Sequence, residues 1–167
     1  GRLEQANELI LKHFNAISPE NCLKPEAVHP RPDVWNFRDA DEYVKYGEDN
    51  DLWILGHTLV WHNQTPEAFF HENYDPAAPY VTREVMLGRL ENYIKTVLTT
   101  VQTQFPGVIV SWDVVNEAVA DSSASLRQSN WTKVVGEDFV NQAFAFARKY
   151  ADEGVMLYYN DYSTPYE

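Results

Sequence analysis

The chain contains the apolar stretch LWILGHTLVW at residues 52–61. It is rich in β-branched and aromatic residues and barely alternates between polar and apolar positions, which is typical of a strand buried on both faces of a parallel sheet. The stretch VIVSWDVV at 108–115 has the same character. Two shorter apolar runs, a weak one at 14–17 and a clearer one at 155–159, predict two further strands.

Segments with helical periodicity lie before and between these strands. Apolar residues recur at core spacing over 1–14, 37–49, 82–105 and 138–151. We expect Thr82 to cap the third of these helices and the Pro-rich stretch 25–32 to be a loop. Helices that alternate with buried strands indicate an α/β fold with a parallel sheet.

Composition excludes several classes of protein. Of the 167 residues, 44% are apolar and 14% aromatic, too many for a disordered chain. No apolar run reaches the roughly 18 residues of a transmembrane helix, and one cysteine allows no intrachain disulfide. A net charge of −12 repels nucleic acid and anionic lipid, so we expect neither a nucleic-acid nor a membrane partner.

Polar and aromatic side chains gather where the predicted strands end. Ligands of parallel α/β folds bind at the carboxyl ends of the strands, so these residues are candidates for a functional site. In chain order they are Glu20, Asn21, Lys24, His57, Trp61, His62, Gln64, Asn116, Glu117, Asn160, Asp161 and Tyr162. Since every predicted strand end contributes, we interpret the set as one site.

Glu117 is the strongest single candidate. It ends an apolar strand beside tryptophan and valine residues, an environment that suits a carboxyl group acting as a general acid. The alternative is a salt-bridged loop glutamate that caps the next helix.

His57 and Trp61 are four residues apart, so in a strand both side chains lie on the same face. An indole ring and an imidazole on one face suit a sugar, although a core histidine bonded to the backbone beside a core tryptophan fits equally well. His57 and His62 face opposite sides and no HExxH motif occurs, so we expect no metal site.

The remaining candidates also have ordinary structural explanations. Lys24 lies near Glu20 and Asn21 and fits an exposed surface pair. Residues 160–162 fit simple turn formers.

Four segments that contain these candidates resemble one known family. They are ENCLKPE at 20–26, GHTLVWHNQ at 56–64, WDVVNEA at 112–118 and YNDY at 159–162. Together they resemble glycoside hydrolase family 10, the endo-β-1,4-xylanases, in the family's order. The resemblance implies part of a (β/α)8 TIM barrel, namely strands two to five of eight. It further implies retaining hydrolysis of β-1,4-xylan without a cofactor.

The matching positions carry implied roles. Glu117 resembles the family's general acid/base, and Asn116 the residue that holds the sugar 2-hydroxyl. The other matches resemble substrate-binding residues: Glu20, Asn21, Lys24, His57, Trp61 and Gln64. Three more positions belong to the motifs as supporting residues: His62, Asn160 and Tyr162.

The family's nucleophile is a second glutamate, which follows a threonine on a later strand, and no Thr-Glu pair follows Glu117. A retaining glycosidase needs two carboxyl groups about 5–5.5 Å apart, and Glu20 and Asp113 are poor substitutes for the second. We therefore expect residues 1–167 to be an incomplete catalytic domain without the first and the C-terminal strands. We expect a complementary polypeptide, or further residues of this one, to complete the barrel.

Two other functions remain open at this point. One is a β-1,4-glucanase on the same barrel, and the other is a non-catalytic xylan-binding or assembly module. Sequons at Asn63 and Asn130, together with the family resemblance, favour an extracellular over a cytoplasmic location.

Overall fold

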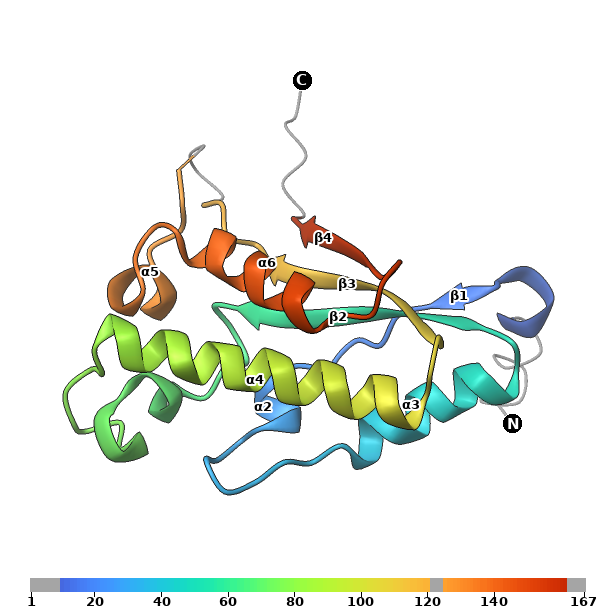
Figure 1. The fold of residues 1–167 in the computed structure, drawn as a ribbon, viewed down its shortest axis with the longest axis horizontal. Coiled ribbons are helices and arrows are strands. Elements are labelled where there is room, and N and C mark those ends of the chain that lie inside the picture. Colours follow the sequence, from blue (N-terminus) through green and yellow to red (C-terminus); the bar gives the residue numbers. More distant parts are fainter. Residues whose placement is uncertain (1–9, 121–124, 162–167) are drawn as a thin grey trace.

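The computed structural model describes residues 10–120 and 125–161, and its four strands form one parallel sheet (Figure 1). The strands follow the sheet in chain order: β1 (Ala16–Ile17), β2 (Trp53–Trp61), β3 (Ile109–Asn116) and β4 (Met156–Asn160). Each pairs with its neighbour in parallel. The expected parallel α/β fold is confirmed, with all four strands close to their predicted positions.

The three main helices also match the periodicity of the sequence. They are α3 (Arg38–Asp49), α4 (Arg83–Gln104) and α6 (Phe139–Tyr150). Thr82 caps α4 as expected, because its side chain accepts a hydrogen bond from the backbone N–H of Val85. Residues 10–13 are helical, and the rest of the expected first helix lies outside the described residues. Within the described ranges, no helix is long and apolar enough to cross a membrane.

Four short helical segments were not expected from the sequence. They are α2 (Pro25–Val28), α5 (Asn130–Val134) and the 3-10 helices η1 (Glu67–Phe70) and η2 (Glu72–Tyr74). The expectation of a loop over 25–32 is wrong at its start, because Pro25 occupies the first position of α2. Proline is tolerated there, since the first N–H of a helix has no intrahelical partner.

The two faces of the sheet differ. On one face Ile54 packs against Gly47 of α3, and Trp112 lies over Gly56. Ile54 and Trp112 are 0% and 1% exposed. On the opposite face Trp53 and Leu55 of β2 are 57% and 38% exposed, and no described helix covers them. We call these the helix-covered face and the open face.

Candidate active site

The register of the sheet brings three strand ends together. Trp61 of β2 pairs with Asn116 of β3, which pairs with Asn160 of β4. Glu117 follows directly after β3. The carboxyl ends of parallel strands meet at one edge of the sheet, and the predicted site residues of these strands therefore lie side by side.

Trp61 and Glu117 are directly hydrogen-bonded. The indole Nε1 donates a hydrogen bond of 2.9 Å to Glu117 Oε2. The other carboxyl oxygen, Oε1, has no hydrogen-bond partner among the described residues. Glu117 does not cap α5, whose N-cap is Ser129, so the reading of Glu117 as a helix cap is wrong. One oxygen is thus oriented by the indole while the second is available to a ligand.

Lys24 is buried rather than exposed. Only 7% of it is accessible, and its Nζ donates to Asn21 Oδ1 at 2.9 Å and to Gln64 Oε1 at 2.8 Å. The Nζ also lies 4.6 Å from the centroid of the Trp61 ring, in reach of a cation–π contact. The interpretation as a surface pair is therefore wrong. Glu20 is exposed and has no hydrogen-bond partner in the described part of the chain.

His57 is oriented by a carboxylate, not by the backbone. Its Nδ1 lies 2.7 Å from Asp113 Oδ2, and both side chains are largely buried. The alternative of a backbone-bonded core histidine is therefore wrong. Because Nδ1 faces Asp113, the opposite ring nitrogen, Nε2, is left to face a ligand. Sequence reasoning missed this partner role for Asp113, although a charged residue within an apolar strand signals the need for one.

The expected alternation of side chains from His57 to Trp61 is interrupted in β2. The pairing of β2 with β3 shifts register between His57 and Val60, so the two-residue repeat is interrupted there. His57 contacts Asp113 near the middle of β3, whereas Trp61 contacts Glu117 just beyond its end.

Asn116 and the supporting residues surround this network. Asn116 is buried, and its Oδ1 accepts a 2.8 Å hydrogen bond from Asn160 Nδ2. This bond leaves the Asn116 amide hydrogens for another acceptor. The His62 ring packs edge-on against Trp61, with centroids 5.7 Å apart. Tyr162 lies outside the described residues.

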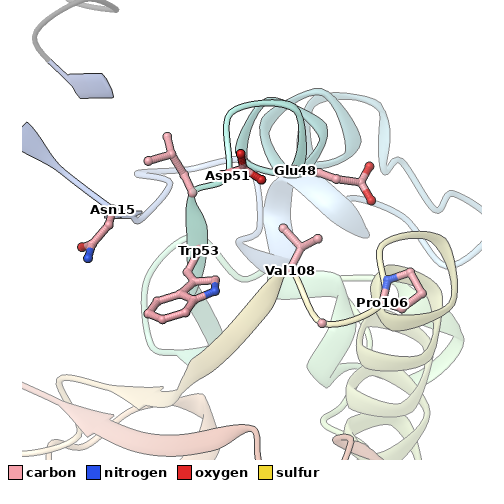
Figure 2. Close-up of a pocket in the computed structure, with 9 residues that line it drawn as sticks. Asn15, Glu48, Asp51, Trp53, Pro106 and Val108 are labelled. Carbon is pink, nitrogen blue, oxygen red and sulfur yellow. The ribbon is translucent and has the colours of Figure 1, made fainter. Parts of the chain in front are cut away.

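A separate cavity of about 400 Å³ lies at the other end of the sheet, where β2 and β3 begin. Figure 2 shows the Trp53 indole and the carboxylates of Glu48 and Asp51 around it. None of the predicted site residues lines it. Among the described residues, no cluster of His, Cys, Asp and Glu is arranged to hold a metal ion.

Comparison with known proteins identifies the family. The sequence profile of glycosyl hydrolase family 10 matches residues 2–167. The chain belongs to this family. Endo-1,4-beta-xylanase B of Butyrivibrio fibrisolvens is 47% identical over 94% of this chain and 26% of its own length.

Solved family 10 structures show the same fold over the matched residues. The intracellular xylanase TsXylA of Thermoanaerobacterium saccharolyticum superposes with a TM-score of 0.88 at 37% identity, over 96% of this chain and 49% of its own. A variant of TsXylA bound to xylotetraose has a TM-score of 0.86 at 39% identity, over 92% of this chain and 47% of its own. The parallel sheet is therefore part of a TIM barrel. The chain spans a quarter to a half of the length of these relatives.

Proposed function

We propose that the chain is a segment of an endo-β-1,4-xylanase in which Glu117 is the general acid/base. The observation that carries this proposal is the bond from Trp61 Nε1 to Glu117 Oε2 at the carboxyl ends of the strands. It orients one carboxyl oxygen and leaves the other available to a ligand, and the preceding residue, Asn116, is buried. The bound xylotetraose of the related TsXylA variant supports a xylo-oligosaccharide as the ligand.

The reaction assigns two tasks to Glu117. It first donates its proton to the glycosidic oxygen while the bond from that oxygen to the anomeric carbon breaks and the nucleophilic carboxylate attacks that carbon. The ionised Glu117 then takes a proton from the water that displaces the carboxylate. The nucleophile is a glutamate outside residues 1–167.

The residues around Glu117 bind the substrate. The Trp61 ring offers a stacking surface, and Lys24 has one ammonium hydrogen left after its bonds to Asn21 and Gln64. His57 Nε2 and the side-chain amide of Asn116 form hydrogen bonds with sugar hydroxyls. Glu20, at the exposed rim, contacts the glycone end, while Asn160 and His62 support their neighbours.

We also propose that further strands of the same barrel cover the open face. Trp53 and Leu55 are exposed on this face, and β4 exposes most of its side chains. Parallel sheets are normally covered on both faces, and in a closed barrel the other strands enclose the inner face. The covering strands belong to a complementary polypeptide or to further residues of this one. An extracellular location remains a prediction from the sequons and the family.

The test is hydrolysis of xylan and of a dinitrophenyl β-xylobioside. Both substrates are given to the chain alone and to the chain mixed with the C-terminal part of a family 10 barrel. We expect activity only in the mixture. In that mixture Glu117→Ala should lower turnover of xylan by about 10²–10⁴-fold, and added azide should restore turnover of the activated xyloside, because azide needs no general base. Glu137→Ala, at an exposed position, is the matched control.

Each part of the proposal has its own contrary result. Unchanged xylan hydrolysis by Glu117→Ala would exclude Glu117 as the acid/base. Binding of xylo-oligosaccharide without hydrolysis in any mixture would instead favour the non-catalytic binding module. A preference for cello-oligosaccharides over xylo-oligosaccharides would favour the glucanase.

A further inference from the structure

The backbone that carries Glu117 has an unusual conformation. Its φ is 53°, in the left-handed region that residues with a Cβ rarely adopt. Such a conformation persists only where the surroundings hold it. The direction of the Glu117 carboxyl group therefore depends on what bonds the backbone at 117–119.

Two side chains and one strand hold this backbone. The N–H of Glu117 donates to the carbonyl of Asn160 at 2.8 Å, and the carbonyl of Glu117 accepts from Arg127 Nε at 3.2 Å. The next two N–H groups, of Ala118 and Val119, both donate to the hydroxyl oxygen of Tyr159, at 3.0 and 3.1 Å. A single phenol oxygen thus satisfies both amides that follow Glu117.

The Tyr159 hydroxyl is in turn oriented by a carboxylate. It donates to Asp161 Oδ2 at 2.5 Å, so it accepts two hydrogen bonds and donates one. This uses its full hydrogen-bonding capacity. Donation to a carboxylate polarises the hydroxyl and makes its oxygen a stronger acceptor for the two amides. Burial, assisted by Asp161, raises the pKa of Tyr159, so the hydroxyl keeps its proton.

We propose that Tyr159, oriented by Asp161, is a positioning residue for the acid/base. Its hydroxyl holds the two amides after Glu117 and thereby fixes the carboxyl group at the Trp61 indole. The part of this inference that concerns catalysis rests on the proposed function, whereas the part that concerns the position of the carboxyl group does not.

The first test measures position in the full chain. Tyr159→Phe removes only the hydroxyl, and Tyr150→Phe is the matched control because Tyr150 donates to Glu91 Oε1 at 2.6 Å on the helix-covered side. We expect Tyr159→Phe to speed hydrogen exchange of the Ala118 and Val119 amides and of the Trp61 indole by on the order of tenfold. The control should change none of them. Unchanged exchange at all three groups in Tyr159→Phe would overturn the proposal.

The second test measures catalytic activity. It uses the protein in the form that hydrolyses xylosides. A displaced acid slows substrates that need protonation of the leaving group. We expect Tyr159→Phe to lower kcat on xylan by on the order of tenfold, with little change in KM. On the dinitrophenyl xyloside, the rate of the first step, in which dinitrophenolate leaves, should be unchanged. An equal loss on both substrates would overturn the positioning role and assign Tyr159 to general stability.

Asp161→Asn provides a second variant if Tyr159→Phe fails to fold. It keeps the tyrosine hydroxyl but weakens its orientation, so all effects should have the same direction and be smaller. Unchanged exchange in this variant would contradict the role of Asp161. A protein that hydrolyses no xyloside would contradict the proposed function, while the Trp61 indole exchange would still decide whether Tyr159 positions the carboxyl group.

Discussion

The helix-covered face and the open face of the sheet use the same strands for different purposes. On the covered face, Ile54 and Trp112 are buried among apolar groups. On the open face, His57 and Asp113 form a hydrogen-bonded pair and Trp53 is exposed. One face therefore contributes most of the hydrophobic stabilisation, while the other presents polar groups that a ligand can reach.

The largest effect is expected where the covered face is tightest. A Cβ on Gly56 would lie 2.4 Å from the Trp112 ring, and that ring is too buried to move aside. Gly56→Ala should lower the free energy of unfolding by about 1–3 kcal/mol or more, as measured by urea denaturation. Gly88→Ala, in α4 with open space around it, should instead raise it by about 0.5–1 kcal/mol. Equal effects of the two changes would refute this account of the covered face.

The next effect concerns function on the open face. Asp113→Asn keeps the shape of the side chain but removes the charge that orients His57 Nδ1. In the active form we expect kcat/KM to fall by about 10–100-fold, with nearly unchanged thermal stability. Asp49→Asn, at an exposed pair with Lys45, serves as control and should leave kcat/KM unchanged. A stability loss as large as the activity loss would show that Asp113 belongs to the structural face.

In the chain alone, a change on the open face should have a smaller effect, and covering of that face should enlarge it. Trp53 is 57% exposed, so Trp53→Ser should change the stability of the chain alone by about 1 kcal/mol or less. If further barrel strands cover this face, the same change should cost about 3 kcal/mol or more in the completed barrel. Chemical denaturation of the chain alone and of the mixture measures both values. Equal costs would contradict the proposed covering of the open face.

The smallest effect lies on the outside of the covered face, where Arg83 of α4 bonds Asp138 before α6. Arg83, with Gln142 second, lowers the pKa of Asp138 from 3.8 to about 2. Because the folded-state pKa is depressed, the stabilisation is fully present above pH 3.8 and lost as pH falls toward about 2. The pair is exposed, so the gain is small. Asp138→Asn should be slightly less stable than wild type near neutral pH. That difference should disappear in acid; a constant difference would contradict the assignment.

Much of the covered face was predictable from local pattern. The strands at 52–61 and 108–115 appear as near-continuous apolar runs, and α4 shows both its period and its cap at Thr82. The short α5 was not predictable, because five residues carry too little periodic signal. Its capping box, Ser129 with Thr132, involves a threonine where the usual signature has Glu or Gln.

The residues of the candidate site were predictable from the sequence, but the hydrogen bonds between them were not. The strand ends and the family motifs predict Lys24, Trp61 and Glu117 as site residues. Nothing in their spacing, however, shows that Lys24 is buried against Trp61. Arg127 and the partner role of Asp113 were missed. Arg127 lies in a loop outside every motif, and its bond to the Glu117 carbonyl depends on how that loop folds back.

The sequence by itself determined the alternation of helices and strands, the strand ends that carry polar groups, and the family. These depend on local periodicity and on short motifs, which are properties of neighbouring residues. The tertiary structure alone decided that the Trp61 indole donates a hydrogen bond to Glu117, which carboxylate faces His57, and that the Tyr159 hydroxyl accepts from the amides after Glu117. Each of these contacts joins residues about 40 or more positions apart. Their geometry is set by strand register and loop path, which no local pattern encodes.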